Sequence, residues 1–188
     1  MELIKKSEAQ KYFDKILCEL DNIQIIKVCS LDDSGDDNRY FIEEPLYIIF
    51  NNKKALIIEY YFIDGLSIEY RNLTEEEIYK FSTIDIRDFF NRTEEIYDYH
   101  TKNIKRRNSL RFSYDAIDNI NINNVNEKDY YKWENNDLVS AKPTNETFDK
   151  ITFNLRNGNK IILCPEPAEM DGYLDVWAEG VDFNQTKY

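Results

Sequence analysis

Residues 148–164 read FDKITFNLRNGNKIILC, two runs rich in large apolar residues that flank Asn157-Gly158. Asn-Gly between such runs is the strongest short-range signal for a β-hairpin, because both residues tolerate the positive φ of a tight turn. A two-residue turn would place Phe153 opposite Ile162, and alternate residues would then share one face, which we expect to be the core side. That face holds Ile151, Phe153, Leu155, Ile162 and Cys164.

The segment that follows the hairpin is acidic and aromatic. Residues 161–186 include six acidic residues and no Lys or Arg. We expect Pro165 and Pro167 to end the second strand, since proline donates no hydrogen bond to a ladder. Aromatic residues beside carboxylates are typical anchors of protein interfaces, although the sequence leaves open a core position for Tyr173 and Trp177. The candidate partner-binding residues are Glu166, Glu169, Asp171, Tyr173, Asp175, Trp177 and Glu179.

Helix signals occur in the first half of the chain. Residues 7–10 form a capping box, and the apolar residues behind it recur at helical spacing, which predicts an amphipathic helix over about residues 8–20. Residues 74–77 form a second capping box and predict a short helix that ends near Phe81. The stretch that begins at Thr93 fits a short helix and a strand equally well.

The centre of the chain predicts an antiparallel meander. Residues 46–50, 55–62 and 66–71 are apolar-rich runs with turn-forming residues between them. Continuous apolar character indicates strands that are covered on both faces. Outside the meander we expect a short strand at residues 23–29 and a further hairpin at residues 130–139. We expect loops at residues 31–44 and 119–129.

These elements predict one α+β domain over residues 1–188. We expect a mainly antiparallel β-sheet, formed by the meander and the C-terminal hairpin. The N-terminal amphipathic helix and one or two short helices would pack against it. A chain of this length can bury a sizeable core without disulfides or metals.

The charge of the chain restricts its partners. It has 36 acidic and 24 basic residues, a net charge of −12. A surface that binds nucleic acid or an anionic membrane needs a basic face, so we expect neither as a ligand. The charge favours a basic protein partner, or it serves solubility alone. We expect the basic residues 105–107 to pair with carboxylates of the chain or to lie on a solvated face.

No motif in the sequence indicates catalysis. His100 is the single histidine, and the three cysteines, Cys18, Cys29 and Cys164, are far apart in sequence. The five glycines never come within seven residues of one another, which excludes glycine-rich phosphate loops. We therefore expect no enzyme and no cofactor. The alternative is a carboxylate-dependent hydrolase that acts on a polar substrate such as a glycan, with its acid and base among the C-terminal carboxylates.

The loop at residues 31–44 is a second acidic segment, with six acidic residues and one arginine. Part of it matches a calcium-loop template, but Asp37 stands where that template requires glycine, so we expect no metal site. We treat this loop as a secondary acidic surface. Its aspartates are Asp32, Asp33, Asp36 and Asp37.

The C-terminal segment, roughly residues 148–180, resembles small bacterial immunity proteins that accompany polymorphic toxins, including those of contact-dependent inhibition systems. The resemblance implies a cytoplasmic, non-enzymatic protein that binds and blocks one cognate toxin domain. The N-terminal residues lack the apolar core of a signal peptide, which agrees with that compartment. A nuclease toxin carries a basic surface for phosphates, and an acidic protein can occlude it.

Overall fold

The computed structural model describes residues 3–4, 6–30, 34–36, 39–42, 45–61, 65–87, 94–98, 103–107, 112–124, 131–135, 137–140, 148–166 and 173–179. Within these residues every strand pair is antiparallel and two helices are present, so the fold is α+β as predicted. The helices are α1 (Lys6–Glu19) and α2 (Glu75–Lys80).

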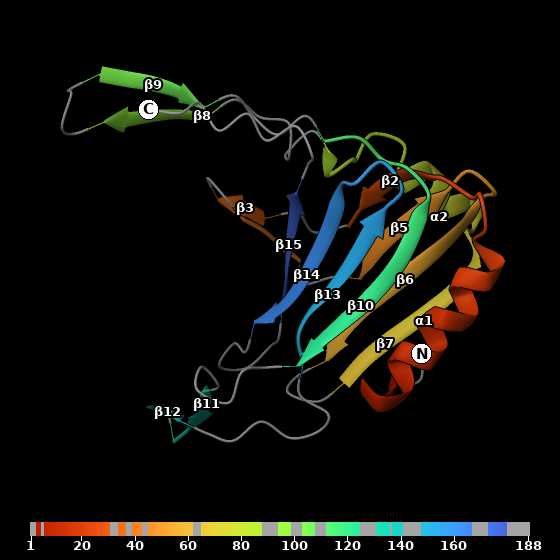
Figure 1. The fold of residues 1–188 in the computed structure, drawn as a ribbon, viewed down its shortest axis with the longest axis horizontal. Helices are drawn as coiled ribbons and strands as arrows, with labels where there is room; N and C mark the ends of the chain where they lie inside the picture. The colour runs from red at the N-terminus through yellow and green to blue at the C-terminus, as the bar shows by residue number, and fades with distance from the viewer. Residues whose placement is uncertain are drawn as a thin grey trace.

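The strands form two larger sheets (Figure 1). The first, which we call the meander sheet, has the order β1 (Leu3–Ile4), β7 (Gly65–Asn72), β6 (Lys54–Tyr61), β5 (Leu46–Phe50) and β2 (Ile25–Cys29). The second, the C-terminal sheet, has the order β10 (Ile117–Asn124), β13 (Phe148–Leu155), β14 (Lys160–Glu166), β15 (Tyr173–Glu179), β4 (Arg39–Ile42) and β3 (Ser34–Asp36).

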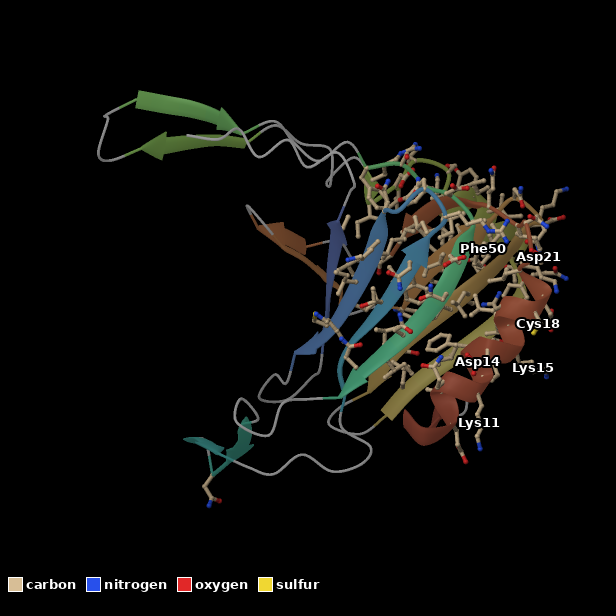
Figure 2. All side chains as sticks on the ribbon, viewed as in Figure 1. Lys11, Asp14, Lys15, Cys18, Asp21 and Phe50 are labelled. Atoms are coloured by element: carbon tan, nitrogen blue, oxygen red, sulfur yellow. The ribbon has the colours of Figure 1, made fainter. Side chains whose placement is uncertain are left out.

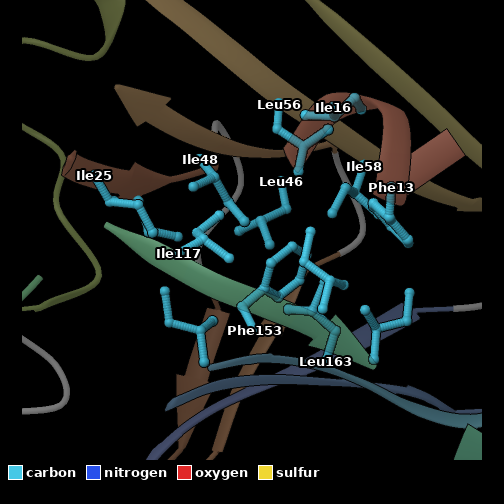
Figure 3. Packing of buried hydrophobic residues seen from close by; sticks show 14 of the residues in the cluster. Phe13, Ile16, Ile25, Leu46, Ile48, Leu56, Ile58, Ile117, Phe153 and Leu163 are labelled. Atoms are coloured by element: carbon cyan, nitrogen blue, oxygen red, sulfur yellow. The ribbon is translucent and has the colours of Figure 1, made fainter. Parts of the chain in front are cut away.

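The main core lies between these two sheets and is shown in Figure 3. Fully burying one large apolar side chain contributes about 1.5–3 kcal/mol, so this layer supplies most of the drive to fold. The meander sheet contributes Leu46, Ile48, Phe50, Leu56, Ile58, Leu66 and Ile68. The C-terminal sheet contributes Ile117, Ile120, Ile151, Phe153, Leu155, Ile161, Leu163 and Val176.

Helix α1 packs against β10 of the C-terminal sheet and β7 of the meander sheet (Figure 1). Its predicted apolar stripe is confirmed, with Ala9, Phe13, Ile16 and Leu20 all buried in the main core. The predicted capping box is wrong, because the helix begins at Lys6 and residue 7 lies inside it. The amide of Gln10 instead donates to Asp14 Oδ1 and to the carbonyl of Ile120, both at 3.0 Å.

The prediction that the meander strands are covered on both faces is confirmed. All five residues of β5 are buried. Alternate residues of β5 and β6 face the main core, and the others belong to a second cluster on the outer face of the meander sheet. That outer cluster consists of Cys29, Tyr47, Ile49, Ala55, Ile57 and Phe81, with Leu73 and Ile84 packed against it.

β2 is the edge strand of the meander sheet, and residues later in the chain cover its outer edge. The N–H of Ile25 donates to the carbonyl of Asp115 at 3.2 Å, and the N–H of Val28 donates to the Tyr114 hydroxyl at 3.2 Å. The N–H of Ile86 donates to the carbonyl of Val28 at 2.8 Å. An uncovered strand edge is a template for pairing with another chain, so these bonds protect the meander sheet from edge-to-edge association.

The register predicted for the C-terminal hairpin is wrong by one residue. Phe153 pairs with Ile161, not with Ile162, because the loop contains three residues, 156–158. The N–H of Gly158 donates to the carbonyl of Leu155 at 2.9 Å, and Gly158 alone in this turn has a positive φ, 85°. A three-residue hairpin loop that ends in a left-handed glycine is a common type, usually built on a type I turn. Ile161 and Leu163 therefore face the main core, while Ile162 and Cys164 take the outer face.

Two predicted loops contain strands. Residues 119–124 belong to β10, where Ile117 and Ile120 are buried and the intervening polar residues are more exposed. Residues 34–36 and 39–42 form β3 and β4. Pro165 does not end β14, which runs to Glu166. The pairing of β14 with β13 ends at Leu163. Pro165 lies beyond that point, so its missing N–H removes no hydrogen bond between β13 and β14. Pro167 lies outside the described residues.

Two small hairpins complete the description. The predicted hairpin near residues 130–139 is confirmed as β11 (Tyr131–Glu134) and β12 (Asp137–Ser140), with Asn135 at φ 53°. The segment after Thr93 is a strand, β8 (Glu94–Asp98), paired with β9 (Asn103–Arg107). Figure 1 shows this second hairpin standing apart from the two larger sheets.

Candidate functional site

The sheet order brings together the two acidic segments of the sequence. β15 carries four of the candidate partner-binding residues and pairs with β4, and β4 pairs with β3 from the secondary acidic loop. Asp175 lies opposite Phe41 in this register. Residues more than a hundred positions apart in sequence are therefore neighbours in one sheet (Figure 1). We call the strands β15, β4 and β3 the acidic sheet end.

The alternation of β15 assigns its candidate residues to one face. Val176 is 1% exposed and belongs to the main core. The alternate positions, 173, 175, 177 and 179, therefore fall on the outer face of the C-terminal sheet, opposite Glu166, Cys164, Ile162 and Lys160 of β14. The remaining candidates, Glu169, Asp171, Asp32, Asp33 and Asp37, lie outside the described residues, whereas Asp36 is on β3.

Cationic residues lie opposite two of these acidic positions. Glu179 is opposite Lys160, and Asp36 is opposite Arg39. Asp175 has Cys164 on one side and Phe41 on the other, so its register neighbours are uncharged. Residues 161–186 contain no Lys or Arg, but Lys160 of β14 and Arg39 of β4 lie across from acidic positions of the sheet. Asp175 is therefore the described acidic position of β15 that has no opposite charge across from it.

The basic residues of the middle section are in register with a different set of acids. In the β8–β9 hairpin Arg107 is opposite Glu94, and Arg106 is opposite Glu95. Opposite charges directly across an antiparallel pair stabilise a hairpin. The backbone register thus sets two residues of this basic cluster across from glutamates of the adjacent strand.

Helix α2 forms a second exposed surface, which the sequence interpretation missed. Ile78 is 50% exposed and Tyr79 is 82% exposed, and no residue of this helix is buried. With Ile26 on β2, they are the large hydrophobic side chains that stand out as exposed in the described part of the chain. Amphipathic spacing did not reveal them, because a six-residue helix is too short to define an apolar face.

An ion pair and a helix cap hold α2 in place. Arg71 donates two parallel hydrogen bonds to Glu77, from Nη2 to Oε1 at 2.7 Å and from Nη1 to Oε2 at 2.9 Å. The predicted capping box is confirmed, since the N–H of Thr74 donates to Glu77 Oε2 at 2.8 Å and the N–H of Glu77 donates to Thr74 Oγ1 at 3.2 Å. Paired, charge-assisted bonds of this kind fix geometry as well as adding stability.

These contacts change the protonation behaviour of the groups involved. Hydrogen bonds from Arg71, and then from Thr74, lower the pKa of Glu77 to about 2 in spite of its partial burial. Burial, and then the nearby charge of Glu77, raise the pKa of Tyr47 to about 12. Tyr47 donates to Glu77 Oε1 at 3.3 Å and its ring lies 4.5 Å from that of Phe81. Glu77 therefore stays ionised at neutral pH, whereas Tyr47 stays protonated and joins α2 to the outer cluster.

The cysteines differ in accessibility. Burial raises the pKa of Cys29 to about 12, so its thiol stays protonated and is a poor nucleophile at neutral pH. Cys18 is exposed on α1 (Figure 2), and Cys164 is half-buried. Among the described side chains no group of three or more His, Cys, Asp or Glu could hold a metal ion. His100 lies outside that part of the chain.

A partly buried tyrosine, Tyr114, joins three segments near the edge of β2. The Tyr114 hydroxyl donates to Asp85 Oδ1 at 2.7 Å, and Arg87 Nη2 lies 3.3 Å from Asp85 Oδ2. Burial, and then the charge of Asp85, raise the pKa of Tyr114, which stays protonated. The contacts of this network serve to close the edge of β2.

No protein-family model, curated protein or solved structure matches this chain. Neither described helix has the length and apolar character needed to cross a lipid bilayer.

Proposed function

We propose that this chain is a cytoplasmic, non-enzymatic immunity protein that binds a cationic toxin domain and blocks its basic surface. The sheet order is the observation that carries the proposal. It joins the two acidic segments, which are far apart in sequence, into the acidic sheet end. The pairing places Asp175 of β15 and Asp36 of β3 on the two strands that flank β4, so that one partner can contact both.

The expected mode of binding follows from charge. A net charge of −12 attracts a basic domain over a distance of about one Debye length, about 8 Å at physiological salt. Such attraction raises the association rate, which then falls as salt is added. A protective complex of ordinary size covers about 1,600 Å² in total. We assign this contact to the outer face of the acidic sheet end, where Asp175 lies on β15.

Co-expression tests the proposal. The chain is expressed together with the C-terminal domain of a toxin encoded beside its gene, and growth is compared with that of cells that express the toxin alone. We expect growth to be restored and a complex to elute from a sizing column. Unrestored growth together with the absence of a complex would refute the immunity function.

A matched pair of charge reversals tests the surface. Asp175→Lys removes the acidic position that lacks an opposite charge, and Glu8→Lys makes the same charge change on the exposed side of α1. We expect Asp175→Lys to slow association several-fold more than Glu8→Lys and to reduce the salt dependence. Equal effects of the two variants would show that only net charge matters and that this face is not the contact.

A further inference from the structure

The acidic sheet end is too small to hold a protein partner by itself. Its strands β15, β4 and β3 contain seven, four and three residues. Residues are about 3.4 Å apart along a strand and strands are about 4.8 Å apart, so these three strands cover about 230 Å² of the sheet plane. A stable complex buries about 800 Å² on each partner. Side chains add relief to the plane, but a partner seated on Asp175 must still contact surface beyond these strands.

The rest of the C-terminal sheet provides such a surface on the same face. In the described sheet β3 is the last strand on one side, and β14, β13 and β10 follow β15 on the other. These strands of seven, eight and eight residues add about 370 Å² of sheet plane. Ile161, Phe153 and Ile120 face the main core, so the residues beside them along each strand lie on the outer face.

The described helices leave this outer face open. The apolar stripe of α1 is buried in the main core, between the two sheets. Helix α2 is joined to the outer cluster of the meander sheet through the bond from Tyr47 to Glu77. Neither helix crosses the outer face of the C-terminal sheet in Figure 1. A partner on the acidic sheet end can therefore extend over β14 and β13 toward β10.

An ordered group of amides lies at the β10 side of this face. Asn121 and Asn154 both donate from Nδ2 to Asn119 Oδ1, at 2.9 and 2.8 Å, and Asn119 Nδ2 donates to Asp118 Oδ2 at 2.9 Å. Asn121 and Asp118 are exposed, whereas Asn119 and Asn154 are half-buried. We call Asn119, Asn121 and Asn154 the amide patch. Side chains that are already ordered lose little conformational entropy when a partner binds.

The hydrogen bonds within the amide patch determine what it can bind. Each bond uses an N–H donor that is directed toward Asn119 or Asp118, which leaves the oxygens of Asn121 and Asn154 as acceptors. The carboxylate of Asp118 adds further acceptor capacity beside them. Acceptors of this kind match a partner whose surface is rich in lysine and arginine N–H donors, which is the partner that Asp175 would attract.

We propose that the contact with the cationic partner protein extends from the acidic sheet end across β14 and β13 to the amide patch. The inference rests on the proposed function, because it concerns the same partner and the same face of the sheet. Charge on the acidic sheet end governs the rate of encounter, and hydrogen bonds to the amide patch govern how long the complex lasts.

Binding kinetics with the toxin domain encoded beside the gene test this extension. The probe is that purified domain, and the variants are Asn121→Ala and Asn154→Ala. The matched control is Asn72→Ala, which removes an exposed amide from β7 of the meander sheet. We expect each patch variant to raise the dissociation rate about three- to tenfold with little change in association, and Asn72→Ala to change neither rate.

A charge placed in the amide patch gives a second readout. Asn121→Lys and Asn72→Lys make the same change in net charge, but only the first lies on the proposed contact. β10 is three strand spacings from β15, about 14 Å, which exceeds the Debye length of about 8 Å at physiological salt. A lysine at position 121 would therefore have little effect on a contact confined to the acidic sheet end. We expect Asn121→Lys to dissociate about tenfold faster than Asn72→Lys.

The outcomes separate the two proposals, and circular dichroism of each variant verifies that it is folded. If the toxin domain binds the natural chain and the three patch variants dissociate at the rates of their Asn72 controls, the extension is refuted and the proposed function stands. If the patch variants dissociate faster than those controls, the contact reaches β10. If the domain does not bind the natural chain at all, both proposals fail.

Discussion

The ion pair between Arg71 and Glu77 should make an acid-sensitive contribution to stability. The pKa of Glu77 falls from 4.5 to about 2 in the folded chain, with Arg71 as the main cause. A difference of one pKa unit between the folded and unfolded chains corresponds to about 1.4 kcal/mol, so this shift sets an upper limit of about 3.4 kcal/mol. The two side chains are 32% and 16% exposed, and solvent screening reduces the expected contribution to about 1–2 kcal/mol.

The pH dependence has a definite sign. Because the folded pKa lies below the unfolded one, the contribution of Glu77 is fully present above about pH 4.5 and is lost as the pH falls toward about 2. The substitution Glu77→Gln keeps the shape of the side chain and removes its charge. We expect it to lower the free energy of unfolding by about 1–2 kcal/mol at pH 7 and to have progressively less effect in acid.

Urea unfolding followed by circular dichroism, between about pH 7 and about pH 2, measures this difference. The control is Glu76→Gln, which removes a carboxylate that is 75% exposed and whose ion pair in the described part of the chain is with Lys80. We expect the control to cost less than about 0.5 kcal/mol. A Glu77→Gln variant as stable as Glu76→Gln at pH 7, or a difference that persists unchanged at about pH 2, would refute the assignment of the pKa shift to this ion pair.

Three further predictions concern the core, the hairpin and the cysteines. Phe13→Ala removes a ring that meets Phe153 edge to face at 5.9 Å and should lower the free energy of unfolding by about 3–5 kcal/mol; a loss below about 1 kcal/mol in a urea titration would contradict this packing. Gly158→Ala forces a side chain into φ 85° and should cost about 1–2 kcal/mol by the same measurement, whereas no cost would argue against the three-residue loop. At about pH 8, iodoacetamide should alkylate exposed Cys18 rapidly and leave buried Cys29 unmodified until the chain unfolds, as mass spectrometry of peptides would reveal.

Local patterns predicted the parts of the fold that depend on neighbouring residues. The stripe of Ala9, Phe13 and Ile16 and the cap at Thr74 are confirmed because both arise within a few turns of one helix. The apolar run of β5 indicated that both faces of the strand are buried, because such a strand does not alternate apolar and polar residues.

The errors have equally specific causes. Asn157-Gly158 was taken as a two-residue turn, but only Gly158 takes a positive φ, and one extra loop residue shifts the second strand to the opposite face. The β10 strand was read as loop because asparagine is rare in strands, yet Ile117 and Ile120 gain their burial from α1 and the facing sheet, which are distant in sequence.

The candidate site was predicted only in part. Its acidic segments were visible in the sequence, and the assignment of partner-binding roles to Asp175 and its neighbours remains a prediction. Their union in one sheet depends on the pairing of β15 with β4, a contact between residues such as Val176 and Tyr40 that no local pattern encodes. The exposure of Tyr79 was equally hidden, because it depends on how the Arg71 contact orients a short helix.

The closure of the β2 edge has a consequence for synthesis on the ribosome. The strands of the meander sheet are complete by Asn72, but the groups that cover β2 belong to Ile86, Tyr114 and Asp115. A nascent chain that ends just after Asn72 therefore has an uncovered β2 edge, because Tyr114 is synthesised 42 residues later. Shortened products that stop before Tyr114 would keep that edge available, and they are the forms in which we expect chaperone capture or aggregation.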